Sequence, residues 1–405
     1  MLNKSNIIIF AIVLLLAIFH TQSQAQIQAQ SEISRIRLLF VGDIMAHQQQ
    51  LDAAKRKDTW DFSPQFRRIR PLIENAFLIG NLETTFAGTI QNGKKLFYTG
   101  YPMFNTPDSL ADTLKDLDFD FLTLANNHIF DKGSDGAKRT TEILDSCDIP
   151  WLGLKLENSQ TSRDVAILEH DGFKLAFINY TYGSNIFPRN YPESSDVKLN
   201  VISDDVIQSS IISAKNFSAD IITACFHWGY EYHYKPNTHQ KHTAEIAFKS
   251  GANLIIGTHP HVLQPVEIIS DDAGNFKSVA WSLGNFVSFQ RTLPRERTCI
   301  LAAEFEKNDS GFTRLTRISI APVYVHAPGQ KRTEITYAGS YEPMLDTLDF
   351  SGISKQKLRQ IRQIGNVILD FMGAKLDDVD DFGFYTLWSE ETPDELPISR
   401  RKTPK

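Results

Sequence analysis

The chain has 405 residues, of which 42% are apolar and 22% are charged. This length fits one large domain or two ordinary ones, and the composition is typical of a soluble globular protein with a sizeable core. The formal net charge of −6 argues against a nucleic-acid-binding protein, which would usually carry a basic surplus. The chain has three cysteines, and an odd number gives no sign of a disulfide framework.

The first residues have the pattern of a secretory signal peptide. Lys4 precedes an apolar run from Ile7 to Phe19, and small residues follow up to Ala25. We therefore predict a signal peptide at 1–25, a polar linker at 26–34, and export to the periplasm or cell envelope. The run is short for a bilayer span, so an N-terminal membrane anchor is the alternative only if the signal is uncleaved.

Beyond the linker, short apolar runs alternate with helical patterns. This alternation indicates βαβ units, and paired runs such as 165–182 indicate added antiparallel strands. The sequence thus predicts an α/β fold with a two-layered sheet core and helices outside. Strands are predicted at 36–43, 77–83, 119–128, 165–182 (two strands), 220–229, 252–261, 276–286, 299–305 and 312–325; helices are predicted at 62–76, 106–117, 134–146, 204–216, 237–250 and 354–372. Within 62–76, Pro71 is expected to kink or restart the helix.

We predict a main domain at 35–330 and a more polar C-terminal extension at 331–405. The extension is expected to contain one helix, 354–372, and to finish in a disordered basic tail, "SRRKTPK".

Five apolar runs end in side chains that can bind metal. Because ligands of an open α/β sheet lie beyond the carboxyl ends of its strands, five such ends can direct these groups into one crevice. The runs are "FVGDIMAH" (Asp43, His47), "LIGNLE" (Asn81, Glu83), "LTLANNH" (Asn126, Asn127, His128), "ACFHWG" (His227) and "IIGTHPH" (His259, His261).

Each group has a simpler interpretation on its own. Asp43 fits a helix cap, Asn126 and Asn127 fit a turn, and His227 beside Trp228 fits a packed core histidine. The five together favour a shared metal site, because all follow the same kind of strand end. A mixture of carboxylate, amide and imidazole suits Zn, Mn or Fe. Such a metal would make hydroxide available near neutral pH and withdraw charge from a phosphoryl or carbonyl oxygen, as ester hydrolysis requires.

In this order, the segments "GDIM", "NLE", "NNH", "HWG", "GTHPHV" and "SLGNF" resemble the bacterial poly-gamma-glutamate capsule-synthesis (CapA) family. That family is related to the calcineurin-like metallophosphoesterases. The resemblance covers roughly residues 35–325. It implies a four-layer αββα sandwich, in which two mixed sheets are flanked by helices, with one or two divalent ions (Mn, Zn or Fe) at the strand ends.

The resemblance also implies roles for single residues. His128, paired with Asn127, would be the catalytic acid. The position two after Asp43 is usually histidine but is Met45 here, and Asn81 stands where a bridging aspartate is usual. Both departures weaken the case for a second metal ion and for hydrolysis. The implied metal ligands are Asp43, His47 (in place of the missing histidine), Asn81, Glu83, Asn127, His227, His259 and His261.

Three further residues are candidates for substrate binding: Trp228, Glu231 and Asn285. Glu231 would hold a substrate amine or a metal-bound water, although a solvated loop acid is the simpler interpretation. Tyrosines are frequent near the motifs and either line a groove for an extended polymer or fill sheet edges. The basic side chains that we place near the motifs are Lys132, Lys235 and Arg291.

The leading hypothesis is an exported metal-dependent enzyme that acts on a cell-envelope or capsule polymer by hydrolysis or transfer. Its expected partners are an anionic or peptide-like envelope polymer and a polymer-synthase complex, with no nucleic acid. One alternative is a non-catalytic, metal-binding envelope accessory protein, which the departures at Met45 and Asn81 favour. Another is a secreted phosphatase or nucleotidase.

Overall fold

The computed structural model describes residues 33–74, 76–157, 164–186, 196–271, 274–327 and 333–390. The predicted signal peptide, nearly all of the linker and the basic tail lie outside the described residues. Among the helices that the structure describes, none is long and apolar enough to cross a bilayer.

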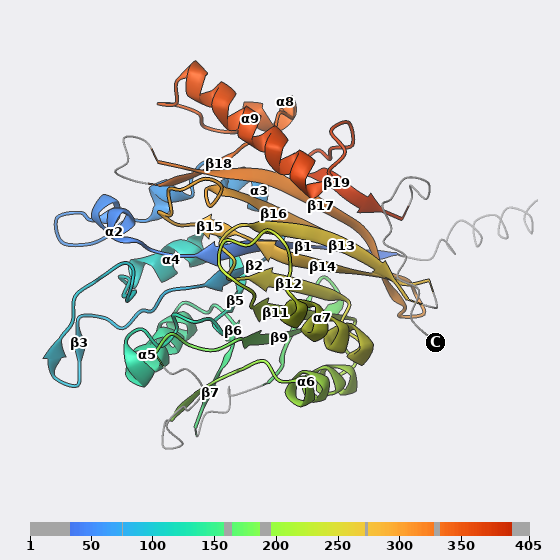
Figure 1. The fold of residues 1–405 in the computed structure, drawn as a ribbon, viewed down its shortest axis with the longest axis horizontal. Helices are drawn as coiled ribbons and strands as arrows, with labels where there is room; N and C mark the ends of the chain where they lie inside the picture. Colours follow the sequence, from blue (N-terminus) through green and yellow to red (C-terminus); the bar gives the residue numbers. More distant parts are fainter. Residues whose placement is uncertain are drawn as a thin grey trace, which may run out of the picture.

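Two mixed β-sheets form the centre of the molecule (Figure 1). The first sheet has the order β18-β17-β16-β1-β2-β5-β6, with β15 also paired to β1 and β19 to β17. Strands β1, β2, β5 and β6 run parallel, whereas β16 and β17 are antiparallel to their neighbours. The strands are β1 (Ser34–Ile44), β2 (Phe77–Leu82), β5 (Phe119–Thr123), β6 (Trp151–Leu152), β15 (Asn285–Val287), β16 (Arg297–Lys307), β17 (Thr313–His326), β18 (Glu334–Tyr337) and β19 (Tyr385–Ser389).

The second sheet has the order β13-β14-β12-β11-β9-β8. Its four inner strands are parallel, and β13 and β8 add antiparallel edges. The predicted pair of strands at 165–182 is confirmed, and its turn is made by Asp171 and Gly172, both with positive φ. The strands are β8 (Ala166–His170), β9 (Phe173–Thr181), β11 (Ile221–His227), β12 (Leu254–Thr258), β13 (Leu263–Ser270) and β14 (Phe276–Leu283); the short pairs β3 (Ile90–Gln91) with β4 (Lys94–Lys95) and β7 (Leu154–Leu156) with β10 (Val197–Leu199) lie apart.

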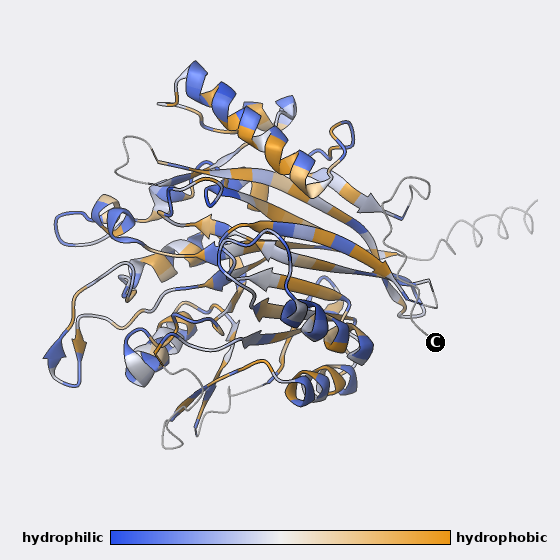
Figure 2. Ribbon diagram, viewed as in Figure 1, coloured by the Kyte–Doolittle hydropathy of each residue, from blue (hydrophilic) through white to orange (hydrophobic). Residues whose placement is uncertain are grey.

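Helices cover both outer faces, so the predicted four-layer α/β sandwich is confirmed (Figure 1). The largest apolar cluster fills the space between the sheets, and a second one joins the second sheet to α6 and α7. Helix α9 lies over β16 and β17. In Figure 2 the strands are largely apolar, whereas α6, α7 and α9 mix polar and apolar residues. The helices are α2 (Gln48–Ala54), α3 (Arg70–Ile73), α4 (Ser109–Asp116), α5 (Gly133–Ser146), α6 (Asp204–Asn216), α7 (Thr238–Ser250), α8 (Glu342–Thr347) and α9 (Lys355–Met372).

Capping residues fix both ends of α7, which the sequence predicted at 237–250. Asn237 accepts a hydrogen bond from the Gln240 amide at the start of α7, and the helix ends before Gly251. A single continuous helix at 62–76 is wrong, because that segment forms a 3₁₀ turn (Ser63–Gln65) and then the short α3, which starts beside Pro71 as the alternative expected. Pro71 lacks an amide hydrogen, so it is tolerated in the first turn of α3 but not inside a longer helix.

The C-terminal extension is built into the first sheet. Strands β18 and β19 both pair with β17, and the sequence had indicated neither. A buried ion pair joins Arg68 Nε to Glu334 Oε2 at 2.7 Å, and Arg68 also donates to the Ser351 carbonyl. The described part of the extension therefore shares the core of the main domain.

Candidate metal centre

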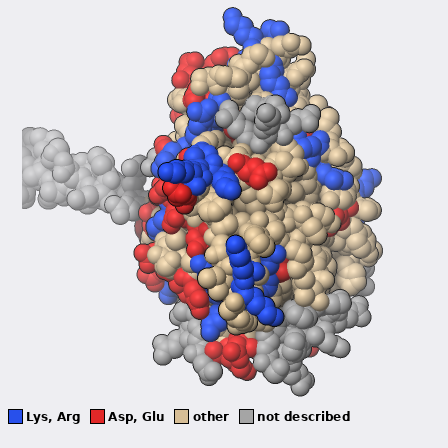
Figure 3. Space-filling view, turned by 90° about the vertical axis from the view of Figure 1, so that its left-hand side faces the viewer, with Lys and Arg blue, Asp and Glu red and all other residues tan. Residues whose placement is uncertain are grey.

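The strands that carry the predicted ligands end at one edge of the sandwich. Asp43 in β1 lies opposite Asn81 in β2 and Asn285 in β15, and in the second sheet His227 lies opposite Thr258. Because these strands are parallel, all of them point their carboxyl ends to the same side. Figure 3 looks onto this end, where a broad uncharged area adjoins basic and acidic patches.

Alternation along β11 decides which of its residues reach the site. Cys225 packs between the sheets, Phe226 packs under the helices, and His227 again faces between the sheets. Trp228 therefore turns to the helix side, where it is buried and donates from Nε1 to the Trp281 carbonyl at 3.0 Å. The prediction that Trp228 contacts substrate is corrected by this geometry.

The turn after β12 directs two imidazoles to Asp43. His259 and His261 have φ values of 95° and 57°, which side-chain-bearing residues rarely adopt, so this turn is strained. Asp43 Oδ2 lies 3.4 Å from the His259 amide nitrogen and 3.1 Å from His261 Nδ1. Asn285 Oδ1 also lies 3.0 Å from His261 Nδ1. With two oxygen acceptors at Nδ1, the proton belongs there and Nε2 keeps a lone pair for a metal.

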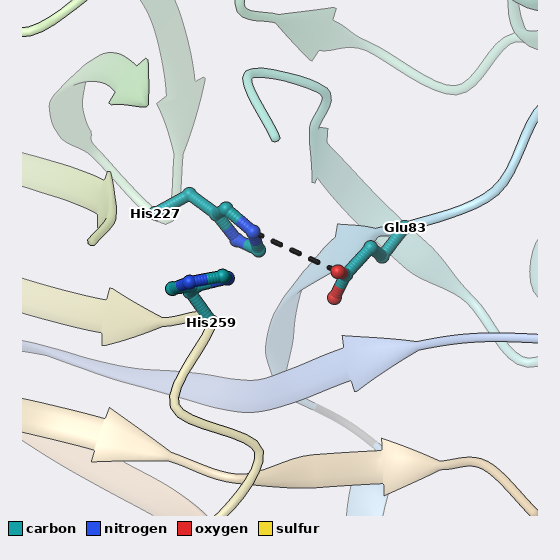
Figure 4. A group of neighbouring side chains, drawn as sticks. All are labelled: Glu83, His227 and His259. Atoms are coloured by element: carbon teal, nitrogen blue, oxygen red, sulfur yellow. Dashed lines mark ion pairs between the residues drawn. The ribbon is translucent and has the colours of Figure 1, made fainter. Parts of the chain in front are cut away.

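Two groups of potential ligands share Glu83, which follows β2. One group is Glu83, His227 and His259, and the other is Asp43, Glu83 and His261; within each, the ligand atoms lie within 4.8 Å of one another. Glu83 Oε1 is 3.7 Å from His227 Nε2 and 3.9 Å from His261 Nε2. Figure 4 shows Glu83 and His227 directed toward each other from opposite sheets, with His259 beside them.

Burial strongly perturbs this cluster. Glu83 is fully buried, and within the described part of the chain neither of its oxygens has a hydrogen-bond partner. Burial and then the Asp43 charge raise the pKa of Glu83 well above its ordinary value. Burial and then neighbouring imidazoles lower the pKa of His227 and of His259 well below the ordinary value, so both are neutral at pH 7.

The donor set fits a divalent cation. An unpartnered buried carboxylate is costly, and a cation would satisfy it. His259 Nδ1 likewise has no hydrogen-bond partner among the described residues. Two carboxylates with neutral imidazoles are the oxygen and nitrogen donors that Zn, Mn and Fe accept.

A histidine–carboxylate pair lies beside the cluster. His128 Nδ1 is 2.8 Å from Asp131 Oδ2, which also accepts the Phe104 amide at 2.7 Å. The amide nitrogen of Asn185 lies 3.4 Å from His128 Nε2. Sequence reasoning missed Asp131, although its spacing of three from His128 in "HIFD" was a usable signal.

The neighbouring amides hold the cluster in place. Asn81 Nδ2 donates to Asp43 Oδ1 at 2.7 Å, and Asn127 Oδ1 lies 2.7 Å from His227 Nε2. Asn126 donates to the Leu82 carbonyl, which fixes the turn after β5. Asn81 and Asn127, which the sequence analysis proposed as metal ligands, therefore contact the metal candidates through hydrogen bonds.

Two predicted residues have other surroundings than expected. His47 belongs to neither of the two groups of potential ligands found among the described residues. Its Nδ1 lies 3.2 Å from the Phe289 amide nitrogen, and burial lowers the pKa of His47 to about 4. Asn285 donates to the carbonyl of Arg295 and contacts His261, so it orients a potential ligand and has little left for a substrate. Glu231 is exposed at the rim.

Tyrosines of the kind expected to line a groove lie at the rim of the cluster, together with Arg295, which escaped the sequence analysis. The ring of Tyr182 lies 4.6 Å from that of His259, which places an aromatic wall on the cluster. The guanidinium of Arg295 lies 3.4 Å above the ring of Tyr232, which is itself 6.2 Å from the His261 ring. Arg295 belongs to no motif, so only the folded chain shows that it lies near the site.

Residues 37–290 match the family model described as bacterial capsule synthesis protein PGA_cap. The chain belongs to this family. The matched segment contains all of the metal candidates, from Asp43 to His261, and stops before β16. The helix and strands at 333–390 that complete the first sheet, and the loop that carries Arg295, lie outside it.

Known relatives agree with this membership. The chain is 26% identical over 290 residues to the PGA biosynthesis protein CapA of Bacillus subtilis, covering 71% of each chain. It is 24% identical over 355 residues to the capsule biosynthesis protein CapA of Bacillus anthracis, covering 86% of this chain and 79% of that one.

Solved structures resemble the chain more distantly. The NAD nucleotidase of Haemophilus influenzae aligns with a TM-score of 0.45 and 14% identity, covering 82% of this chain and 62% of that one. The 5'-nucleotidase precursor of Thermus thermophilus aligns with a TM-score of 0.44 and 13% identity, covering 83% of this chain and 60% of that one. The chain thus spans less than two thirds of either structure, and neither likeness bears on its function.

Proposed function

We propose that this capsule-synthesis family protein is an exported, metal-dependent enzyme that acts on a cell-envelope polymer by hydrolysis or transfer. Family membership supports the link to capsule formation, and the buried donor set supports a metal. The names of the two relatives suggest a polymer such as poly-gamma-glutamate, which is anionic and peptide-like. The N-terminal apolar run supports export, and a polymer-synthase complex is the partner that we propose.

Asp43, Glu83, His227, His259 and His261 would hold one or two ions of Mn, Zn or Fe. Because Glu83 belongs to both groups of donors, it would be the shared carboxylate that Asn81 cannot be. When bound, such an ion supplies a Lewis acid and lowers the pKa of a coordinated water to roughly 7.

The chain's own residues supply the proton chemistry. Asp131 accepts the Nδ1 proton of His128 and fixes the orientation of the ring, so Nε2 is directed to where a leaving group would lie. Phe104 packs edge-on against the same ring at 4.8 Å and limits its rotation. In the proposed reaction, His128 Nε2 donates a proton to the leaving group, and Asp131 stabilises the charge that the imidazole ring carries before this transfer.

One observation carries the proposal: Glu83 is a fully buried carboxylate without a hydrogen-bond partner among the described residues, and imidazoles surround it. The test is metal analysis of the purified full chain, followed by turnover of a generic phosphodiester with the metal-loaded protein. We expect stoichiometric metal, and we expect His128→Ala to abolish turnover while the metal remains. His239→Ala, which alters an exposed histidine on α7, is the matched control and should change neither.

A specific observation favours a second candidate, a non-catalytic accessory protein. Asn81 is neutral where the related phosphoesterases use a carboxylate, and Met45 is buried and offers no hard donor. Stoichiometric metal without turnover of any ester, peptide or phosphate would support this role and overturn the enzymatic one. Turnover confined to small phosphomonoesters would instead support a secreted phosphatase.

A further inference from the structure

We propose that Arg295, stacked on Tyr232 at the rim of the metal centre, binds a carboxylate of the substrate. The inference rests on the proposed function, because it assigns the substrate class of the same site. Its first support is an unused cation. Among the residues that the structure describes, Arg295 forms no ion pair, whereas Arg291, earlier in the same loop, is paired with Glu296 at 2.9 Å.

The loop that carries Arg295 is fixed against the centre. The carbonyl of Arg295 accepts a hydrogen bond from Asn285 Nδ2 at 3.2 Å, and the same amide holds His261 through Oδ1 at 3.0 Å. The next residue, Glu296, is buried and accepts from the Tyr324 hydroxyl at 3.0 Å. The side chain of Asn285 thus links the main chain of Arg295 to His261, a potential metal ligand.

Tyr232 is held just as firmly on the other side. Its amide donates to the Pro260 carbonyl at 2.7 Å, between the two histidines of the strained turn, and its φ of 65° is itself unusual. Its ring lies 6.2 Å from the His261 ring and 3.4 Å beneath the Arg295 guanidinium. The tyrosine therefore acts as a platform that positions the cation over the approach to the centre.

This arrangement suits a carboxylate. A guanidinium that stacks on an aromatic ring keeps the N–H groups of its edge free, and these form a planar fork that matches two carboxylate oxygens. Stacking also reduces the rotamer freedom that an exposed arginine would otherwise lose on binding. A polymer with one carboxylate in each repeat would present such a group beside the bond at the metal centre.

The test is equilibrium binding of a short γ-linked glutamate oligomer, measured by calorimetry with the full chain in chelator and again after metal loading. Arg295→Gln should weaken binding by roughly tenfold in both states, since hydrogen bonds to charged groups contribute about that factor. Arg70→Gln removes the same charge from an exposed arginine on α3 and should have no effect. An oligoglutamine of equal length, which lacks the carboxylates, should bind the wild type weakly and not respond to Arg295→Gln.

Tyr232 supplies a second test of the platform. Tyr232→Phe retains the ring and should retain binding, whereas Tyr232→Leu should resemble Arg295→Gln. Equal affinity of the wild type and Arg295→Gln for the glutamate oligomer would overturn the proposal, as would a response seen with inorganic phosphate but not with the oligomer. Because these measurements require no turnover, they fail or succeed separately from the enzymatic proposal.

Discussion

Replacing Glu83 with glutamine should stabilise the metal-free protein and abolish its stabilisation by metal. Glu83 has no hydrogen-bond partner among the described residues, and burial together with Asp43 raises its pKa. In the absence of a cation, the folded chain at pH 7 must keep this carboxyl protonated or bury its charge. Glutamine has nearly the same shape and carries no charge, so it removes that cost.

The magnitude follows from the protonation equilibrium. A carboxyl with the ordinary pKa of 4.5 costs about 3.4 kcal/mol to keep protonated at pH 7, at about 1.36 kcal/mol for each pH unit. The amide of glutamine still needs partners in the same pocket, which offsets part of the gain. We therefore expect Glu83→Gln to raise the free energy of unfolding by about 1–3 kcal/mol in chelator at pH 7.

The sign of the pH dependence is fixed by the raised pKa. The folded wild type binds a proton at Glu83 that the unfolded chain releases above about pH 4.5, so its stability falls as the pH rises from there. The advantage of Glu83→Gln should therefore grow with pH above 4.5 and vanish below it. Metal at about 100 times its dissociation constant should add about 2.7 kcal/mol to the wild type and nothing to the variant.

Urea unfolding followed by circular dichroism, in chelator and in added metal, measures these differences. Glu169→Gln, at an exposed position of β8, is the matched control and should change the free energy of unfolding little. A Glu83→Gln variant that is less stable than the wild type in chelator at every pH would refute the reasoning, because Glu83 would then be a structural residue.

Three further predictions concern other parts of the molecule. Asp131→Asn should lower turnover by about 100-fold with the metal content unchanged, because His128 loses the acceptor that orients it; steady-state kinetics and elemental analysis check this. His326 has its pKa lowered to about 4 by burial and then by nearby cations, so stability should fall as the pH drops from 6.5 toward 4, and His326→Gln should remove about 1 kcal/mol of that fall in urea unfolding. Arg68→Met should reduce the free energy of unfolding by about 3–5 kcal/mol, and Glu334→Gln added to it should restore much of the loss.

Each of these has a contrary outcome. Unchanged turnover in Asp131→Asn would exclude the pair as a proton donor. The control variant His239→Gln, at an exposed histidine, should lose stability between pH 6.5 and 4 as the wild type does. If His326→Gln loses as much stability as this control, His326 does not cause the loss. A stable Arg68→Met protein would show that the extension does not depend on the buried ion pair.

The parts of the fold that are patterned locally could be predicted from the sequence. Alternating apolar runs located the inner strands, and Asn237 and Ser354 marked the starts of two long helices. Strands β18 and β19 were missed because they have only 4 and 5 residues, which is too short for a clear alternating pattern. The pairing of β19 with β17 also depends on contacts across more than 50 residues of sequence, such as Arg317 with Ser389.

The site could be predicted where its residues follow strands, because parallel strands bring their ends together. Asp43, His227 and His261 do converge, with His261 Nδ1 3.1 Å from Asp43 Oδ2. Successive residues of a strand point to opposite faces of the sheet, so His227 faces the site and its neighbour Trp228 faces the helices. Arg295 was not predicted, because it belongs to no motif and its position depends on contacts with Asn285 and Tyr232 that the sequence does not show.

The central claim is that Asp43, Glu83 and the three histidines hold a divalent cation between the two sheets. The most direct test is elemental analysis of the full-length protein after dialysis, comparing the wild type with Glu83→Gln. The account predicts stoichiometric Zn, Mn or Fe in the wild type and its loss in the variant. Equal metal in both proteins, or none in the wild type after incubation with each of the three ions, would contradict it.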